Sequence, residues 1–257
     1  MRGVFAAGLF LFSATLWGLQ PTAANQVRKD LSLGHADAAL RVLDPSLAQN
    51  PSDAEAHNLR CRVYYEEEQW DAAIADCEAA VRLEPGNSED HLWLGRAYGR
   101  KAAHGSLVEA YKLAHKVHSE FEAAVRFDPH NAAALADLGE FDVEAPIVAG
   151  GGIRSAEAIL VQLRGVDPVR ASTLQARIAE ERKDYVSAEA AYKAAIAQSR
   201  GPADEWIDLA EFYQHRGRTE DALSALHTAV SLDGTHGPTL VAAANLLRLA
   251  TVLNDGA

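Results

Sequence analysis

Three groups of residues in this sequence could do chemistry, and the first is a histidine cluster. His115, His118 and Glu122 follow one another at spacings of three and four residues, so they would share one face of a helix, with His104 upstream. Such a face could hold zinc. We favour a solvated helix face instead, because ten histidines scattered through the chain make this spacing easy to reach by chance. The sequence therefore predicts no metal site and no cofactor.

The second group is the only pair of cysteines, Cys61 and Cys77. They would lie on antiparallel helices, at similar heights above a predicted turn at Glu68 and Gln69. In an oxidising compartment they could form a disulfide, which would stabilise the fold by roughly 3 kcal/mol. The alternative is that both are small buried packing residues. The sequence leaves the two interpretations equally open.

The third group is an insertion loop in which Pro146 is followed by Gly150, Gly151 and Gly152 and then by Arg154. Three glycines after a proline cannot continue a helix, so a new helix should start near the arginine. Backbone amides at a helix start can hold an anion. The Lys-Ser/Thr ending of a phosphate-binding loop is missing, however, so we favour a flexible connection that turns the chain.

No arrangement typical of catalysis stands out. The sequence contains no Gly-x-Ser-x-Gly and no His-Glu-x-x-His, and its acidic run at residues 66–68 reads as a charged surface turn. We therefore expect the protein not to be an enzyme. A net charge of -12 without a basic stripe also argues against nucleic acid as a partner.

The first residues indicate export. A basic start is followed by an apolar run from Val4 to Leu19 and by small residues suited to cleavage after Ala24. Residues 1–24 are therefore expected to be a signal peptide, which leaves a periplasmic or extracellular protein with no membrane insertion after cleavage. The alternative is an uncleaved anchor, because the run is slightly long for a signal.

The elements that carry these residues recur with a fixed period. Alanines recur every thirty-four residues in the second helices of predicted hairpins. The pairs are Ala39 and Ala73, Ala188 and Ala222, and Ala195 and Ala229. Such a period predicts a solenoid built from helix-turn-helix units, each stacked on its neighbours.

The last complete unit carries a resemblance to a known family. Trp206, Leu209, Ala210, Tyr213 and Ala222 stand at the offsets of the Trp, Leu-Gly, Tyr and Ala positions of the tetratricopeptide repeat. The unit at residues 54–87 fits as well, through Ala73, Ala80 and Pro85. The resemblance implies an all-α, right-handed α-solenoid of about five helical hairpins with a C-terminal capping helix.

This repeat domain would span residues 25–257. Its units are expected at about 25–53, 54–87, 88–131, 132–168, 169–202 and 203–236, with the cap at 237–254. The front unit looks partial, starting near Leu31. The unit at 88–131 should hold a long hairpin, because its closing residues arrive ten residues late after an insertion near residues 101–113, and the next unit holds the insertion loop.

The resemblance further implies that the first helices of the hairpins line a concave groove that binds a partner. Side chains of both signs with some apolar surface would suit an extended peptide or a helix; the groove residues are Asn58, Arg62, Tyr65, Trp93, Arg96, Glu140, Arg170, Arg177 and Glu211. The expected function is a protein-interaction or scaffold module of the bacterial cell envelope, with a protein or peptide partner. The alternative is a periplasmic small-molecule carrier, or a transporter-associated subunit, with a pocket near the two insertions.

Overall fold

The computed structural model describes residues 18–233 and Val241. Between residues 18 and 233 it contains α-helices, one short 3-10 helix and no strand. The helices are α1 (Pro21–Ser32), α2 (Ala36–Gln49), α3 (Ala54–Glu66), α4 (Trp70–Leu83), α5 (Ser88–His104), α6 (Leu107–Phe127), α7 (Ala132–Glu144), η1 (Ile147–Ala149), α8 (Ile153–Val166), α9 (Pro168–Glu181), α10 (Tyr185–Gln198), α11 (Ala203–His215) and α12 (Thr219–Leu232). The prediction of an all-helical solenoid is confirmed.

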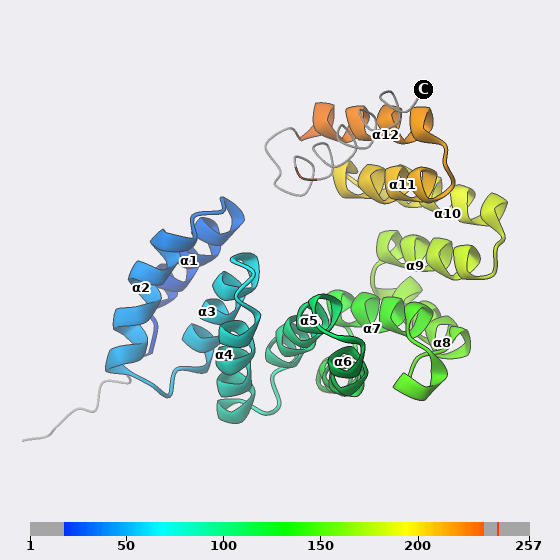
Figure 1. Ribbon diagram of the computed structural model, residues 1–257. Coiled ribbons are helices and arrows are strands. Elements are labelled where there is room, and N and C mark those ends of the chain that lie inside the picture. Colours follow the sequence, from blue (N-terminus) through cyan, green and yellow to red (C-terminus); the bar gives the residue numbers. More distant parts are fainter. Residues whose placement is uncertain (1–17, 234–240, 242–257) are drawn as a thin grey trace, which may run out of the picture.

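Successive helices pair into hairpins that stack in chain order along a curved arc (Figure 1). The N-terminal hairpins, α1 to α4, face α11 and α12 across an opening (Figure 1). Helices α5 and α7 border this opening, whereas α6 and α8 lie on the outer side of the arc (Figure 1). None of the helices within residues 18–233 combines the length and the apolar character needed to cross a membrane.

Polar residues in the turns define where the first helices α3, α5, α7 and α9 begin, whereas α1 and α11 have no side-chain cap. The side chains of Asp53, Asn87, Asn131 and Asp167 each accept a hydrogen bond from a backbone N–H two or three residues further on. These bonds satisfy donors that have no partner inside the helix. The first three of these caps stand two residues after a proline, so each turn ends one helix and starts the next.

Small residues in the core allow the helices to approach closely. All six alanines of the thirty-four-residue pattern are 0% exposed. Gly95 on α5 acts in the same way, because a Cβ atom there would lie 2.6 Å from ring carbons of Phe121 on α6. Larger side chains at these places would force the paired helices apart.

Two histidines thirty-four residues apart repeat the same bridge. The Nε2 atoms of His57 and His91 lie 3.1 and 3.0 Å from the carbonyl oxygen of the proline six residues earlier. Their Nδ1 atoms lie 2.7 Å from Asp76 and 2.6 Å from Glu120, each on the second helix of the hairpin. The bond with Glu120 raises the pKa of His91. Each histidine thus fixes a turn to the outer helix of its own unit.

The front unit is a complete hairpin, which corrects the prediction of a partial one. Helix α1 begins at Pro21 and buries Ala24 and Val27, the first 1% and the second 0% exposed. The sequence hid this helix because it packs through small and β-branched residues and carries no aromatic anchor. Residues 1–17 of the predicted signal peptide lie outside the described residues, and so does the predicted cap at 237–254 apart from Val241.

The insertions appear where the sequence placed them. Helices α5 and α6 are 17 and 21 residues long, against 12 to 14 for the other α-helices between residues 18 and 233, which confirms the long hairpin. The insertion loop forms η1 and the break before α8, and η1 contacts α6. The two insertions therefore lie side by side.

Candidate functional site

The N-terminal part of the concave face is built around Trp93. The guanidinium groups of Arg62 from α3 and Arg96 from α5 both lie over its ring, each 4.6 Å from the ring centroid. Its indole Nε1 donates to Glu89 Oε1 at 2.8 Å, and the ring of Tyr65 meets it edge-on at 5.5 Å. Arg62 and Tyr65 are three residues apart and share one face of α3, and Trp93 and Arg96 share one face of α5 in the same way. Trp93 itself is only 9% exposed and packs in the core, so it orients the two cations but offers a partner little surface of its own.

The two arginines differ in how they are paired. Arg96 donates through Nε and Nη2 to the carboxylate of Asp137 on α7, at 2.5 and 3.3 Å. Burial alone would lower the pKa of Arg96, but the bonds to Asp137 raise it. Burial lowers the pKa of Arg62, and the charges of Arg28 and Arg96 lower it further. Arg62 stays charged at neutral pH nevertheless, because the guanidinium pKa starts so high.

The C-terminal part of the concave face is centred on Arg177. Its Nε lies 3.4 Å from Glu140 on α7, and its Nη2 lies 3.8 Å from Asp208 on α11. Burial raises the pKa of Asp208 to about 7; Arg177 opposes this, while Glu140, Glu211 and Glu205 reinforce it. One arginine is thus shared among several carboxylates, and their repulsion is only partly neutralised.

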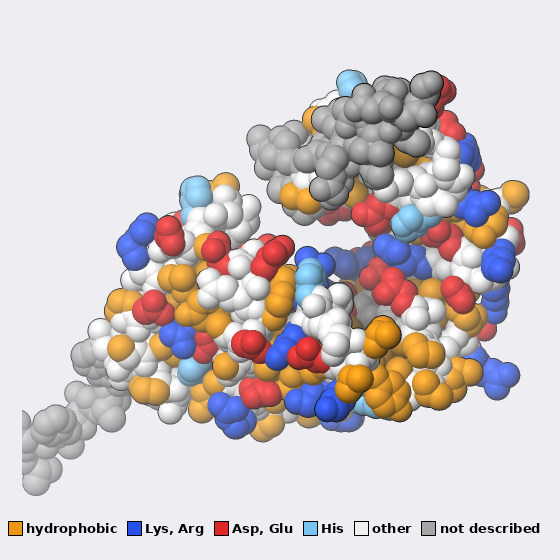
Figure 2. Space-filling model, in the orientation of Figure 1, with side chains coloured by type: hydrophobic (Ala, Val, Ile, Leu, Met, Phe, Trp, Pro, Cys, Tyr) orange, Lys and Arg blue, Asp and Glu red, His pale blue; other side chains and the backbone are white. Residues whose placement is uncertain are grey.

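A recess of about 570 Å³ opens beside this cluster. It extends over α7, α9 and α11, and its lining residues are Ala136, Glu140, Asp167, Val169, Arg170, Thr173, Leu174, Gln198, Ser199, Arg200, Asp204, Glu205 and Asp208. Figure 2 shows the hollow between the two arms of the arc, with acidic and basic side chains on its walls. The concave face therefore offers both volume and charge to a partner.

Comparison with known proteins gives the family. Two sequence models of the tetratricopeptide repeat match the chain, one over residues 25–88 and 148–205 and the other over residues 179–247. The chain is a tetratricopeptide repeat (TPR) protein. No curated protein matches its sequence.

Solved structures of similar fold agree with this assignment. A thermophilic TPR protein of Thermus thermophilus is 21% identical over 88% of this chain and 97% of its own, with a TM-score of 0.55. The type IV pilus biogenesis factor PilW is 15% identical, with coverages of 82% and 91% and a TM-score of 0.58. The human IFIT1 dimer with m7Gppp-AAAA is 22% identical over 89% of this chain and 54% of its own, with a TM-score of 0.62. These likenesses concern the fold, which is in general a scaffold for binding protein or peptide partners.

The TPR register places most of the predicted groove residues together, in two sets. Arg62, Tyr65, Trp93 and Arg96 form the first set, as described above. In the second set, Glu140 and Arg177 are in contact, exposed Glu211 acts on the same Asp208, and Arg170 lies at the edge of the recess, 3.4 Å from Asp167.

Two of the predicted groove residues need correction because they are buried. Trp93 is 9% exposed and belongs to the core, beneath the arginines that contact it. The other residue is Asn58. It is only 6% exposed, and its side chain donates to Asp90 Oδ1 at 2.7 Å inside the contact between α3 and α5. A buried carboxylate needs a donor, and Asn58 supplies it. This amide therefore serves the stacking of two TPR units and is not presented to a partner.

Three further residues of this surface, Arg100, Asp137 and Asp208, were not among the predicted groove residues. The two aspartates occupy the same place in their units as Trp93 does in its unit. That shared register was the available signal. It marks the position that meets the arginine of the preceding unit in two cases, Arg96 with Asp137 and Arg177 with Asp208.

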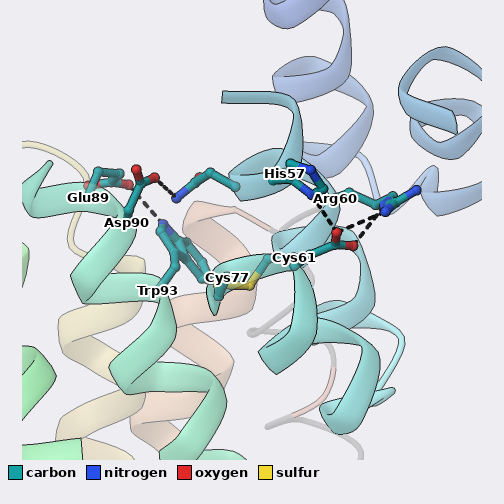
Figure 3. The surroundings of a disulfide bond; sticks show 9 residues. His57, Arg60, Cys61, Cys77, Glu89, Asp90 and Trp93 are labelled. Atoms are coloured by element: carbon teal, nitrogen blue, oxygen red, sulfur yellow. Dashed lines mark hydrogen bonds and ion pairs between the residues drawn. A yellow bond between two sulfur atoms is a disulfide. The ribbon is translucent and has the colours of Figure 1, made fainter. Parts of the chain in front are cut away.

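The cysteines lie in the second hairpin, away from the recess. Cys61 on α3 and Cys77 on α4 form a disulfide, with 5.3 Å between their Cα atoms, and both are 0% exposed. Figure 3 shows the bond between the two helices, with His57 and Arg60 directed at a carboxylate on one side. That carboxylate is Asp76, which accepts two hydrogen bonds from Arg60. The hairpin is thus held by a covalent bond and by charge.

The insertion loop is packed against α6. Gly150 has a φ of 101°, a conformation that favours glycine, and a Cβ atom there would lie 2.7 Å from Nδ1 of His118. The amide of Gly152 donates to the carbonyl oxygen of Asp142 at 2.7 Å, whereas Arg154 is exposed. The loop therefore uses its backbone to close the turn, as expected for a connection.

The histidines that could have formed a metal site point to different neighbours. His104 stacks on Trp70, and His115 meets Tyr111 edge-on. His118 lies 3.6 Å from Asp142, whose pKa is raised to about 6, mainly by burial. Within the part of the TPR chain that the structure describes, no group of three His, Cys, Asp or Glu residues could hold a metal ion.

Proposed function

We propose that this protein is a non-catalytic interaction module of a bacterial cell envelope, which binds a partner peptide or helix in its concave groove. The observation that carries the proposal is the row of charged and aromatic side chains that runs without interruption along the first helices, from Arg62 on α3 to Asp208 on α11. A long surface with both polar anchors and a recess suits a segment of chain better than a small molecule.

The carrier alternative receives less support from the insertions. His118 and Phe141 fill the space under the insertion loop, with their ring centroids 5.4 Å apart. The apolar side chains at the insertions face solvent, since Leu107 is 91%, Ile147 84% and Val148 67% exposed. A carrier would instead turn such side chains inward around its ligand.

Export belongs to the same proposal. The apolar run before Gln20 and the disulfide between Cys61 and Cys77 both suit an oxidising compartment outside the cytoplasm. Cleavage after Ala24 would remove the first turn of α1, including the buried Ala24 itself. N-terminal sequencing of the protein from its source decides this point: we expect a new N-terminus near residue 25, and retention of Met1 would contradict export by cleavage.

The groove is tested by filling it. Thr173 lines the recess on α9, so Thr173→Trp should block a bound segment without entering the core. Ala75→Trp places the same side chain on the exposed face of α4 and is the matched control. Affinity capture from envelope extract should lose its partner with Thr173→Trp and keep it with Ala75→Trp. Equal capture by both variants, with unchanged helical content, would refute binding in the groove.

A further inference from the structure

The N-terminal half of the groove holds arginines that are oriented but not neutralised. The nearest carboxylate to Arg62 is Glu89, at 3.9 Å from Nη1, and the buried Nε of Arg62 has no hydrogen-bond partner. Arg100 lies over the rings of Trp70 and Tyr65, at 5.5 and 5.9 Å. Among the residues described, no carboxylate comes within 4.0 Å of Arg100. Stacking on rings fixes a guanidinium while leaving N–H groups at its edge for an anion.

The C-terminal half has the opposite charge. The recess over α7, α9 and α11 is lined by five carboxylate side chains and two arginines, and one of those arginines, Arg170, already pairs with Asp167. The buried Oε2 of Glu205 has no hydrogen-bond partner. The pKa of Glu140 is raised, chiefly by burial and also by Asp137 and Glu144, although Arg177 opposes it. A cation in this recess would relieve the repulsion among its carboxylates.

We propose that the groove selects a partner segment with one acidic half and one basic half. The acidic half lies on the arginine and aromatic surface of α3 and α5, and the basic half lies in the acidic recess of α7, α9 and α11. This inference rests on the proposed peptide-binding function and names the class of peptide. A segment with its charges in mixed order would place like charges together at both ends of the groove, which weakens binding.

Two synthetic peptides test the charge order. Both carry the same acidic, basic and spacer residues and a fluorescein label, but one has its charges in two blocks and the other has them alternating. Fluorescence anisotropy with the full chain should show the block peptide binding roughly tenfold more tightly, because each wrongly placed pair loses a modest attraction and gains a repulsion. The difference should vanish at about 1 M salt, where charges are screened within roughly 3 Å.

Charge-neutralising variants assign the acidic half. Arg62→Gln combined with Arg100→Gln should weaken the block peptide several-fold and leave the alternating peptide nearly unchanged. Arg82→Gln combined with Arg126→Gln removes the same charge from positions on α4 and α6, outside the groove, and should weaken neither. If the control pair lowers binding as much as the groove pair, only net charge matters and the inference is wrong.

A photo-cross-linker at either end of the block peptide shows where each half lies. The acidic end should label α3 or α5, and the basic end should label α9 or α11, as mapped by mass spectrometry. Equal binding of the two peptides, labelling in the reverse order or a lack of binding by both overturns the selected charge order. The proposed function fails separately, if Thr173→Trp still captures the native partner.

Discussion

Replacing Asp208 with asparagine should change how stability depends on pH. Burial beside Glu140, Glu211 and Glu205 raises the pKa of this carboxyl to about 7 in the folded protein, against 3.8 in the unfolded chain, despite Arg177. The folded state therefore binds the proton more tightly, and stability falls as pH rises from about 4 to 7. At about 1.36 kcal/mol per pH unit the gap corresponds to about 4 kcal/mol. Because the side chain is 27% exposed, solvent screening reduces this to about 2 kcal/mol.

Urea unfolding at pH 5, 6, 7 and 8, followed by circular dichroism, measures the effect. The wild-type protein should lose about 1 kcal/mol more stability than Asp208→Asn between pH 5 and pH 8, because asparagine stays neutral throughout and the rest of the loss falls below pH 5. Other groups with raised pKa values, such as Asp90 and Asp142, titrate in both proteins and cancel in the difference. Parallel pH profiles for the two proteins would refute the argument that crowded carboxylates are held in the groove.

Three further predictions concern the scaffold. Ala73→Leu should destabilise the fold by about 1 to 3 kcal/mol, because the residue is 0% exposed between helices, and an unchanged melting midpoint would contradict the repeat register. Reducing the disulfide between Cys61 and Cys77 should cost about 3 kcal/mol in urea unfolding, given its sequence separation of 16; thiol titration of the unfolded, unreduced protein should find no free thiol. Gly150→Ala should destabilise by about 1 to 3 kcal/mol through its positive φ and its contact with His118; adding His118→Ala should restore only part of this loss, and full recovery would exclude backbone strain.

The repeat was predictable because it is local. A hairpin brings its own helices together, so the spacing of Ala73 and Ala80 within one unit already defines the packing face, and both are 0% exposed. The break at the insertion loop was predictable for the same reason, since a proline and three glycines exclude a helix whatever surrounds them. The cysteine pair was predictable only in part. The spacing of Cys61 and Cys77 brought them together across the hairpin, but it fitted a disulfide and two reduced packing residues equally well.

The contacts between units were not predictable, because they depend on the angle at which hairpins stack. Arg96 reaches Asp137, 41 residues away, and only a comparison of the same position in several units points to that aspartate. Asn58 has the register of a groove residue, yet Asp90, 32 residues away, draws it into the helix contact. Helix α1 escaped recognition because it packs, mainly on α2, through the small and β-branched residues Ala24 and Val27 and has no aromatic anchor.

The disulfide between α3 and α4 also bears on the order in which the hairpins unfold. In a stack where each unit contacts only its neighbours, fraying starts at the ends and advances one interface at a time. The disulfide keeps α3 and α4 joined even after the hairpins on either side have opened. Denaturation that starts at α12 can travel through several uncrosslinked units before it reaches that hairpin, whereas denaturation from α1 meets it after a single unit. We therefore expect the N-terminal end to unfold more slowly than the C-terminal end, and refolding after partial unfolding to start from the cross-linked hairpin of α3 and α4.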